Sequence, residues 1–309
     1  MTRHFLRDDD LTPAEQATVL DRAAELKASR FARRPLEGPR VVALIFDKPT
    51  LRTQLSFTVG VAELGGHPMV VDGRLAQIGS RESIADVTRV IERQVAAIVW
   101  RTYEQSRVEE MAANSRVPVV NALTDDFHPC QILADLPTIR EHKGELAGLT
   151  MTYVGDGANN MAHSYLLGGA TAGMHVRIGA PASHQPRADI LQRATEIADQ
   201  TGGSTMVTGD QISAALDADI VITDTWVSMG QEAEARDRKG VESPFAKFAV
   251  DSELVGHAAE EAIVMHCLPA YRGFEISGDV IDGPQSVVWD EAENRLHAQK
   301  AVLSFLLES

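Results

Sequence analysis

The sequence predicts an α/β protein built of two lobes, each a parallel β-sheet flanked by helices. Short apolar segments alternate with helical segments along the chain, which is the pattern of parallel strands joined by helices. The alternation stops at residues 144–148 and then begins again. A length of 309 residues suits about two domains. We therefore expect one domain over residues 1–143, completed by a C-terminal helix at 291–309, and a second domain over residues 148–290.

The first lobe begins with a helix whose start is marked in the sequence. Thr12-Pro13-Ala14-Glu15 has the form of a capping box with proline at the first helical position, so a helix should run to about Ser29. Residues 41–46 form a strongly apolar segment that predicts a buried strand. The other elements expected in this lobe are strands at 69–71, 96–100 and 117–121, helices at 54–64, 83–93 and 108–113, and a long helix ending near 143.

The second lobe repeats the pattern. Its polar segment at 224–238 is typical of a loop. The expected elements are strands at 150–154, 175–178, 204–207, 220–223, 262–265 and 286–289, helices at 159–172, 188–201, 211–216 and 291–307, and short helical segments at 245–249 and 253–256.

Composition excludes several classes of function. The net charge of −15 argues against a general nucleic-acid or anionic-membrane binder, because both need a basic surface. Two cysteines cannot form a disulfide framework, which favours a cytoplasmic protein with reduced thiols. No apolar stretch reaches the roughly 18 residues of a membrane helix. The first ten residues carry no apolar segment, so we expect no signal peptide.

Thr50-Leu51-Arg52-Thr53 lies where the strand at 41–46 gives way to a helix. A helix N-terminus offers unpaired backbone N–H groups that suit phosphate, and hydroxyls and a guanidinium add further donors. A plain helix cap beside a surface arginine is the simpler interpretation of this motif, and the motif alone does not exclude it.

Two further polar features follow strands of the same lobe. Arg101 ends its strand, and His128-Pro129-Cys130-Gln131 opens a helix. Three such features at the carboxyl edge of one sheet favour an oxyanion pocket. The alternative for His128 is a loop histidine packed by Pro129, and we expect Cys130 to serve helix packing only.

Gly155-Asp156-Gly157-Ala158-Asn159-Asn160 superficially resembles a dinucleotide-binding fingerprint. It lacks the third glycine, and the next strand ends in Gly179-Ala180-Pro181 without an acidic residue for a ribose. These departures argue against a nicotinamide-dependent dehydrogenase. We interpret the segment as a tight turn that presents Asn160 to a carboxylate; capping of the helix by Asn160 is the alternative.

An acid and a thiol follow two strands of the second lobe. Asp224 begins a loop and is suited to a ligand ammonium, although it is equally suited to cap a local turn. Cys267 follows the strand at 262–265, and a lone cysteine is most often a small buried apolar residue. No His, Cys and Asp spacing predicts a zinc site.

Together these residues resemble the aspartate/ornithine carbamoyltransferase family. The family motif Ser-Thr-Arg-Thr-Arg corresponds to Thr50-Leu51-Arg52-Thr53-Gln54, where Leu51 offers only its backbone N–H and Gln54 lacks the second arginine's charge. The motifs His-Pro-(Thr or Cys)-Gln and His-Cys-Leu-Pro correspond to residues 128–131 and 266–269. The resemblance implies carbamoyl-phosphate ligands at Thr50, Leu51, Arg52, Thr53, Gln77, Arg101, His128, Gln131, Cys267, Leu268 and Arg295. It implies ornithine ligands at Asn160, Asp224, Ser228, Met229 and Cys267.

The resemblance also implies the reaction. Carbamoyl phosphate and L-ornithine give L-citrulline and phosphate, in arginine metabolism, with Arg52, Arg101, His128 and Cys267 as catalytic residues. The attacking δ-amine must be neutral, which costs roughly 4–5 kcal/mol at pH 7 if its pKa is near lysine's 10.4. Cys267 orients the amine and can accept its proton, and no cofactor or metal is implied. The family forms homotrimers with shared active sites, to which a neighbouring subunit lends Gln77.

Three alternatives remain beside this interpretation. A carbamoyltransferase for N-acetylated ornithine, putrescine or aspartate is disfavoured by Asp224 with Ser228-Met229-Gly230, which suits a free α-amino group. Arg272 is the one cation near the second site that would suit aspartate. A dehydrogenase is disfavoured by the turn at Gly155. A non-catalytic phosphate-binding protein would not need the second set of ligands.

Overall fold

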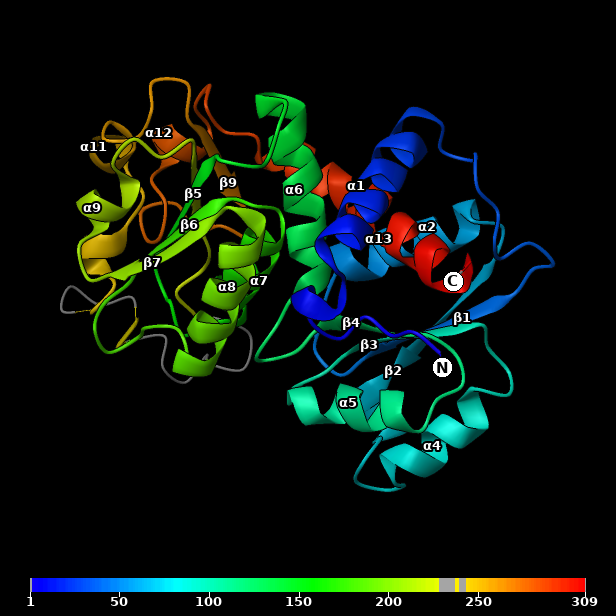
Figure 1. Ribbon diagram of the computed structural model, residues 1–309. Coiled ribbons are helices and arrows are strands. Elements are labelled where there is room, and N and C mark those ends of the chain that lie inside the picture. Colours follow the sequence, from blue (N-terminus) through cyan, green and yellow to red (C-terminus); the bar gives the residue numbers. More distant parts are fainter. Residues whose placement is uncertain (1, 228–236, 239–242, 309) are drawn as a thin grey trace. The chain divides into compact units, whose positions relative to one another are not determined.

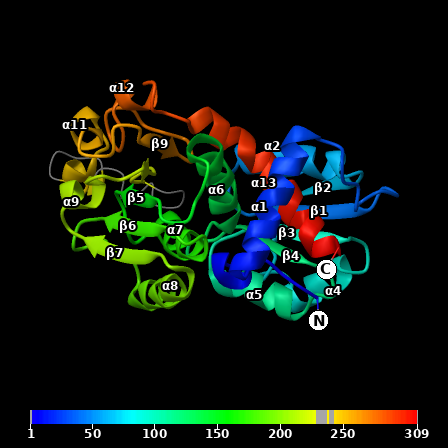
Figure 2. The ribbon, with the colours of Figure 1, turned by 45° about the horizontal axis from the view of Figure 1, so that its top comes forward.

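The computed structural model describes residues 2–227, 237–238 and 243–308. The chain divides into two compact units, Met1–Pro137 with Glu293–Ser309, and Thr138–Ala292. Each unit holds one parallel sheet with helices on both faces (Figures 1 and 2), which confirms the predicted fold class. The divisions fall inside two helices, α6 and α13, so the chain passes between the units within helices.

The first unit is built on a four-stranded sheet of order β2-β1-β3-β4. Figures 1 and 2 show α4 and α5 on one face of this sheet and α1, α2 and α13 on the other. Its elements are η1 (Asp8–Asp10), α1 (Pro13–Ala28), β1 (Val41–Phe46), α2 (Arg52–Glu63), β2 (His67–Asp72), α3 (Gly73–Ala76), α4 (Ile84–Ile91), β3 (Ala97–Arg101), α5 (Gln105–Ala113), β4 (Val119–Leu123), α6 (Pro129–Lys143) and α13 (Val288–Glu308).

The register of this sheet brings the ends of three strands together. Phe46, the last residue of β1, pairs with Asp72 of β2 and with Arg101 of β3. The segments that follow β1, β2 and β3 therefore leave the sheet at one edge. This edge carries the motif that begins at Thr50, the segment that contains Gln77, and Arg101.

The second unit is built on a five-stranded sheet of order β7-β6-β5-β8-β9. Thr223, which ends β8, pairs with His266, which ends β9, so the next residues, Asp224 and Cys267, emerge side by side. Its elements are β5 (Thr150–Val154), α7 (Asn160–Thr171), β6 (His175–Gly179), α8 (Ala188–Thr201), β7 (Ser204–Thr208), α9 (Gln211–Ala215), β8 (Ile220–Thr223), η3 (Ala246–Phe248), α11 (Ser252–Val255), β9 (Ile263–His266) and α12 (Gly278–Ile281).

The strand predicted at 286–289 is wrong. Ser286 forms only an isolated bridge with Val264, and α13 already begins at Val288. Val288 packs into the apolar core of the unit, and Asp290 and Glu291 lie in the first turn of the helix, where acidic side chains are favoured. The apolar residues that suggested a strand are therefore the buried start of a helix.

Among the described residues, no helix combines the length and the apolar character needed to cross a bilayer.

Candidate functional site

Thr53 is the meeting point of the first site. It lies in the first turn of α2 and is 1% exposed. Its hydroxyl oxygen accepts hydrogen bonds from Arg295 Nη2 at 2.6 Å and from Arg101 Nη1 at 3.4 Å. Arg101 and Arg295, which are 48 and 242 positions from Thr53 in the sequence, thus converge on one hydroxyl.

The N-terminus of α2 has no side-chain cap. Leu51 occupies the cap position and its side chain makes no capping hydrogen bond. Because the first N–H groups of a helix have no partner within it, the turn from Leu51 to Thr53 presents donors that suit an anion. The simpler interpretation, a capped helix start, does not fit this geometry. Arg52 is half-buried beside Thr53.

His128 belongs to the same cluster electrostatically. It is buried in front of α6, and burial together with Arg295 and Arg101 lowers its pKa well below the usual value. The imidazole is therefore neutral near pH 7. A neutral imidazole carries one N–H group, which can donate a hydrogen bond to a carbonyl oxygen.

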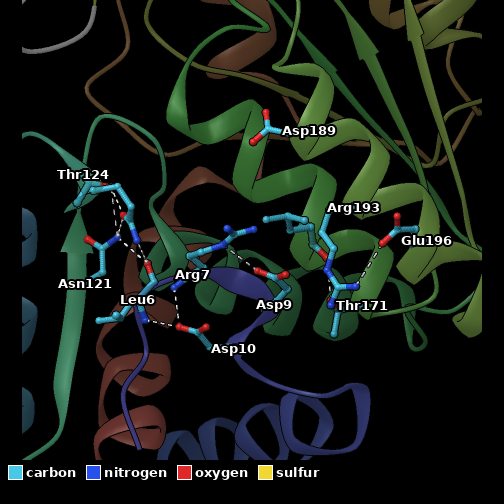
Figure 3. Close-up of polar contacts among 12 residues, drawn as sticks. Leu6, Arg7, Asp9, Asp10, Asn121, Thr124, Thr171, Asp189, Arg193 and Glu196 are labelled. Atoms are coloured by element: carbon cyan, nitrogen blue, oxygen red, sulfur yellow. Dashed lines mark hydrogen bonds and ion pairs between the residues drawn. The ribbon is translucent and has the colours of Figure 1, made fainter. Parts of the chain in front are cut away.

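The loop that leads to His128 is shaped by a buried polar network. Two hydrogen bonds join Thr124 to Phe127: Thr124 N donates to Phe127 O at 2.8 Å, and Phe127 N donates to the Thr124 side-chain oxygen Oγ1 at 3.2 Å. Figure 3 shows Asn121 joining Thr124 to the N-terminal segment, through a hydrogen bond from its Nδ2 to the carbonyl of Leu6 at 2.9 Å. The loop before His128 is thus held by bonds within itself and by bonds to the N-terminal segment.

The remaining residues predicted for the first site lie at several depths. Gln131 is fully buried and donates to Asp135 Oδ1 at 2.8 Å. Gln77 is exposed at the end of α3, with a left-handed φ of 50°. Thr50 is half-buried, and Leu51 is 76% exposed. The buried part of the cluster is therefore formed by Thr53, Arg101, His128 and Arg295, while Gln77 belongs to a separate surface segment.

Cys130 serves packing, as expected. It is buried, and its thiol donates to the Asn121 carbonyl at 3.3 Å. Burial raises its pKa to about 12, so the thiolate does not form at neutral pH.

In the second unit, Asp224 and Cys267 are in direct contact. The Cys267 thiol donates to Asp224 Oδ1 at 3.1 Å, and the same oxygen accepts the Thr225 N–H at 2.7 Å. Burial raises the pKa of the Asp224 carboxyl. Cys267 is only half-buried, so it is not the inert core residue of the simpler interpretation. A carboxylate beside a partly open thiol can receive a cationic amine.

His266 organises the backbone beside Cys267. Its Nδ1 accepts the Leu268 N–H at 2.9 Å, so by this hydrogen-bond pattern its proton is on Nε2, which faces Glu275 Oε1 at 3.3 Å. Leu268 has a φ of 58°. Asp224, His266 and Cys267 each have an atom that could hold a metal ion, and these atoms lie within 4.8 Å of one another. Because hydrogen bonds engage both nitrogens of His266, this arrangement works as a hydrogen-bonded network.

For Asn160, the sequence left two interpretations open, which are binding of a carboxylate and capping of the helix. Asn159 is the residue that caps α7, through a hydrogen bond from Ala162 N at 2.9 Å, and Asn160 is the first helical residue. The capping alternative therefore applies to the neighbouring asparagine. Ser228 and Met229, the other predicted ornithine ligands, lie outside the described residues.

Several polar residues near the predicted site residues were given no role in the sequence analysis. Asp47 and Arg107 hold segments of the first unit together, and an ion pair of 2.7 Å joins Arg238 to Asp156 in the second. Only the positions of Asp47 and Asp156, each just after the end of a strand, could have pointed to them from the sequence. The side chains that they bond are 53 or more residues away, so these contacts were not foreseeable.

A helix N-terminus beside two buried arginines, in an α/β unit, is the arrangement expected of an anion-binding protein. Residues 3–141 match the carbamoyl-phosphate-binding domain of aspartate/ornithine carbamoyltransferases, and residues 147–306 match their aspartate/ornithine-binding domain. The chain belongs to the aspartate/ornithine carbamoyltransferase family.

Similar proteins cover the whole chain. An ornithine carbamoyltransferase of Clavibacter sepedonicus is 62% identical over 307 residues, which is 99% of each chain. One from Renibacterium salmoninarum is 59% identical over 312 residues, which covers 100% of this chain and 99% of the relative. Among solved structures, the ornithine carbamoyltransferase from Pyrococcus furiosus matches with a TM-score of 0.94 at 44% identity, over 100% of this chain and 98% of its own.

Proposed function

We propose that this chain is an ornithine carbamoyltransferase of arginine metabolism, which converts carbamoyl phosphate and L-ornithine to L-citrulline and phosphate. The observation that carries the proposal is the convergence of Arg101 and Arg295 on the Thr53 hydroxyl at an uncapped helix N-terminus. Residues 1–143, completed by 291–309, are the proposed carbamoyl-phosphate domain, and residues 148–290 the ornithine domain.

The first site suits carbamoyl phosphate. In the proposed complex the phosphate binds Arg52, Arg101, the backbone N–H groups of residues 50–53 and Gln77 of a neighbouring subunit. Arg52, Thr53, Arg101 and His128 lie near the carbonyl oxygen, with Gln131, Leu268 and Arg295 as further ligands. Donors fixed where negative charge develops stabilise the transition state more than the ground state. The low pKa of His128 supports a neutral donor role for it.

The second site suits the amino-acid end of ornithine. Asp224 is proposed to bind the α-ammonium together with Ser228, and Asn160 and the Met229 backbone to bind the α-carboxylate. An incoming ammonium would offset the cost of burying the Asp224 carboxylate, whose pKa burial raises. This gain requires a free α-amino group, so it favours ornithine over N-acetylornithine. Putrescine keeps that amine but lacks the α-carboxylate that Asn160 and the Met229 backbone are proposed to bind.

In the proposed reaction the neutral δ-amine attacks the carbamoyl carbon. A C–N bond forms and the C–O bond to phosphate breaks. The proton that the amine loses ends on the leaving phosphate, so the products are citrulline and hydrogen phosphate. Cys267 is proposed to orient the amine together with the Leu268 carbonyl. Its thiol already donates to Asp224, which supports an orienting role in the thiol form. A covalent carbamoyl-cysteine is not needed, because carbamoyl phosphate is already activated.

A homotrimer with shared active sites is the proposed assembly. Around the edge strand β2 the first unit exposes large apolar side chains, which a partner subunit could cover. They are Leu51, Leu55, Met69, Val70 and Leu75. Gln77 follows this surface directly in the chain, which supports its being lent to a neighbour. The two free cysteines fit a cytoplasmic location.

One assay tests the proposed function. Purified protein is mixed with carbamoyl phosphate and either L-ornithine, N-acetyl-L-ornithine, putrescine or L-aspartate, and carbamoylated product and phosphate are measured. We expect equimolar citrulline and phosphate with ornithine, and rates at least about 100-fold lower with the other three amines. Preference for another amine would reassign the acceptor, and phosphate without carbamoylated product would refute the transferase.

A further inference from the structure

Asp47 joins the segment after β1 to the end of β3. It lies three residues before Thr50 and is 6% exposed. Its backbone N–H donates to the Arg101 carbonyl at 2.9 Å. Its Oδ2 accepts hydrogen bonds from Trp100 Nε1 at 3.0 Å and Thr102 Oγ1 at 2.5 Å, the two neighbours of Arg101. One carboxylate therefore holds the side chains on both sides of Arg101, a predicted phosphate ligand.

Arg107, on α5, extends this network to the segment that carries Gln77. Its Nη2 lies 3.6 Å from Asp47 Oδ2 and donates to the Ile78 carbonyl at 2.7 Å. Its Nε donates to Thr102 Oγ1 at 2.9 Å, and its guanidinium lies 5.0 Å from the centre of the Trp100 ring. A planar guanidinium can serve these partners at once, which a lysine cannot.

Two glycines let the Gln77 segment sit directly on this pair. A Cβ at Gly73 would come within 1.8 Å of Asp47 Oδ1, and one at Gly79 within 3.1 Å of Arg107 Nη1. Gly79 also has a φ of 81°. The segment from Gly73 to Gly79 thus rests on Asp47 at one end and on Arg107 at the other, with Gln77 exposed between them.

We propose that Arg107, held by Asp47, is a positioning residue that sets the orientation of Gln77 for the active site of the neighbouring subunit. The inference rests on the proposed function, because it needs Gln77 to be lent between subunits. Arg107 would then act in trans: its loss harms the site that receives Gln77, while Arg52 and Arg101 of its own subunit stay competent.

The test uses hybrid trimers of full-length chains. Two variants are expressed together with different affinity tags, and assemblies that carry both tags are purified. Each Arg52→Ala subunit has a dead site but lends a well-placed Gln77, and each Arg107→Ala subunit has an intact Arg52. In a cyclic trimer every hybrid contains one interface that combines the two intact parts, so one site in three should recover.

We expect Arg107→Ala homotrimers to lose about tenfold or more in kcat/KM for carbamoyl phosphate, with the KM for ornithine unchanged. Hybrids with Arg52→Ala should recover about a third of wild-type activity, as counted from the symmetry. Arg116→Ala is the matched control, because Arg116 is an exposed arginine paired with Glu92 in the same unit, and it should behave as wild type.

The outcomes separate the two proposals. If Gln77→Ala recovers activity with Arg52→Ala but Arg107→Ala does not, Arg107 acts within its own subunit and the inference is overturned. If neither pair recovers, Gln77 is not lent, and the shared site fails together with the inference. If Arg107→Ala does not fold, Arg107→Lys replaces it; this variant keeps the charge but not the several bonds, and it should show a smaller loss of the same trans-complementing kind.

Discussion

Asp224 shows how a single residue serves binding at a cost in stability. Its carboxylate is buried, and burial raises its pKa above the ordinary value of 3.8. A group with a raised folded pKa favours folding in its neutral form, so its contribution is complete at pH below 3.8 and is lost as pH rises through the folded value. In the protein without substrate, burial therefore makes the negative charge of this carboxyl unfavourable.

The variant Asp224→Asn removes that charge and keeps an oxygen that can accept the Thr225 N–H. We expect the free energy of unfolding at pH 7 to rise by roughly 1–3 kcal/mol. We expect kcat/KM for ornithine to fall about 100-fold, because the α-ammonium loses its counter-charge. Chemical denaturation at pH 7 and pH 3.5 measures the first effect, which should vanish at the lower pH.

Asp189→Asn is the matched control for this variant. Asp189 is an exposed acid in the same unit, paired with Arg187, and its replacement should change stability by less than about 0.5 kcal/mol. A loss of stability in Asp224→Asn at pH 7 would show that the carboxylate is already compensated without substrate.

At the scale of elements, the sequence predicted the helices and strands that are marked by a pattern of neighbouring residues. The strand at 41–46 matches β1, because its apolar run is buried in the sheet. The capping box of α1 is present, with Glu15 N donating to Thr12 Oγ1 at 3.3 Å and Thr12 N to Glu15 Oε2 at 2.9 Å. The four-residue helices α3 and α12 were missed because one turn carries no periodicity.

The site followed the same rule. Arg101, His128, Asp224 and Cys267 could be proposed as site residues because each lies at or after the end of a strand, and parallel strands gather their carboxyl ends at one edge. Asp47 and Arg107 were not recognisable as a pair, because they lie 60 positions apart in the sequence and only the folded sheet brings them together. The local sequence indicates where a residue lies on a helix or strand. It does not indicate which side chain from a distant part of the sequence will contact that residue.

The cap of α1 predicts a stability loss in acid. Arg3 pairs with Glu15, and this hydrogen-bonded ion pair lowers the pKa of Glu15 to about 2. A depressed carboxyl pKa stabilises the fold above the unfolded value of 4.5, and the contribution is lost as pH falls towards 2. Because both side chains are partly exposed, we expect Arg3→Ala to cost only about 1 kcal/mol at pH 7.

Denaturant unfolding at pH 7 and at pH 2 measures this difference for Arg3→Ala. The wild type and the variant should converge at the lower pH. Arg34→Ala is the control, since Arg34 pairs with Glu37 at the surface and neither residue lies in a helix. An equal destabilisation at both pH values would show that Arg3 acts through packing on Phe305 and not through its charge.

At the scale of the whole molecule, the two predicted sites differ in how they respond to pH. The arginines of the first unit stay charged, and the lowered pKa of His128 keeps that imidazole neutral down to pH values below its ordinary range. Carbamoyl-phosphate binding should therefore change little between pH 6 and 9. The proposed reaction also needs the δ-amine of ornithine as a neutral nucleophile, and this group titrates far above neutrality.

We therefore expect kcat/KM for ornithine to rise with pH by about tenfold per unit from pH 6 towards 8, since the neutral fraction of an amine rises by that factor below its pKa. Steady-state rates in buffers of constant ionic strength measure this slope, and the KM for carbamoyl phosphate serves as the internal control. A flat ornithine profile would mean that proton removal does not limit attack. An inflection near pH 6.5 in the carbamoyl-phosphate profile would mean that His128 is protonated there, which its burial between Arg101 and Arg295 should prevent.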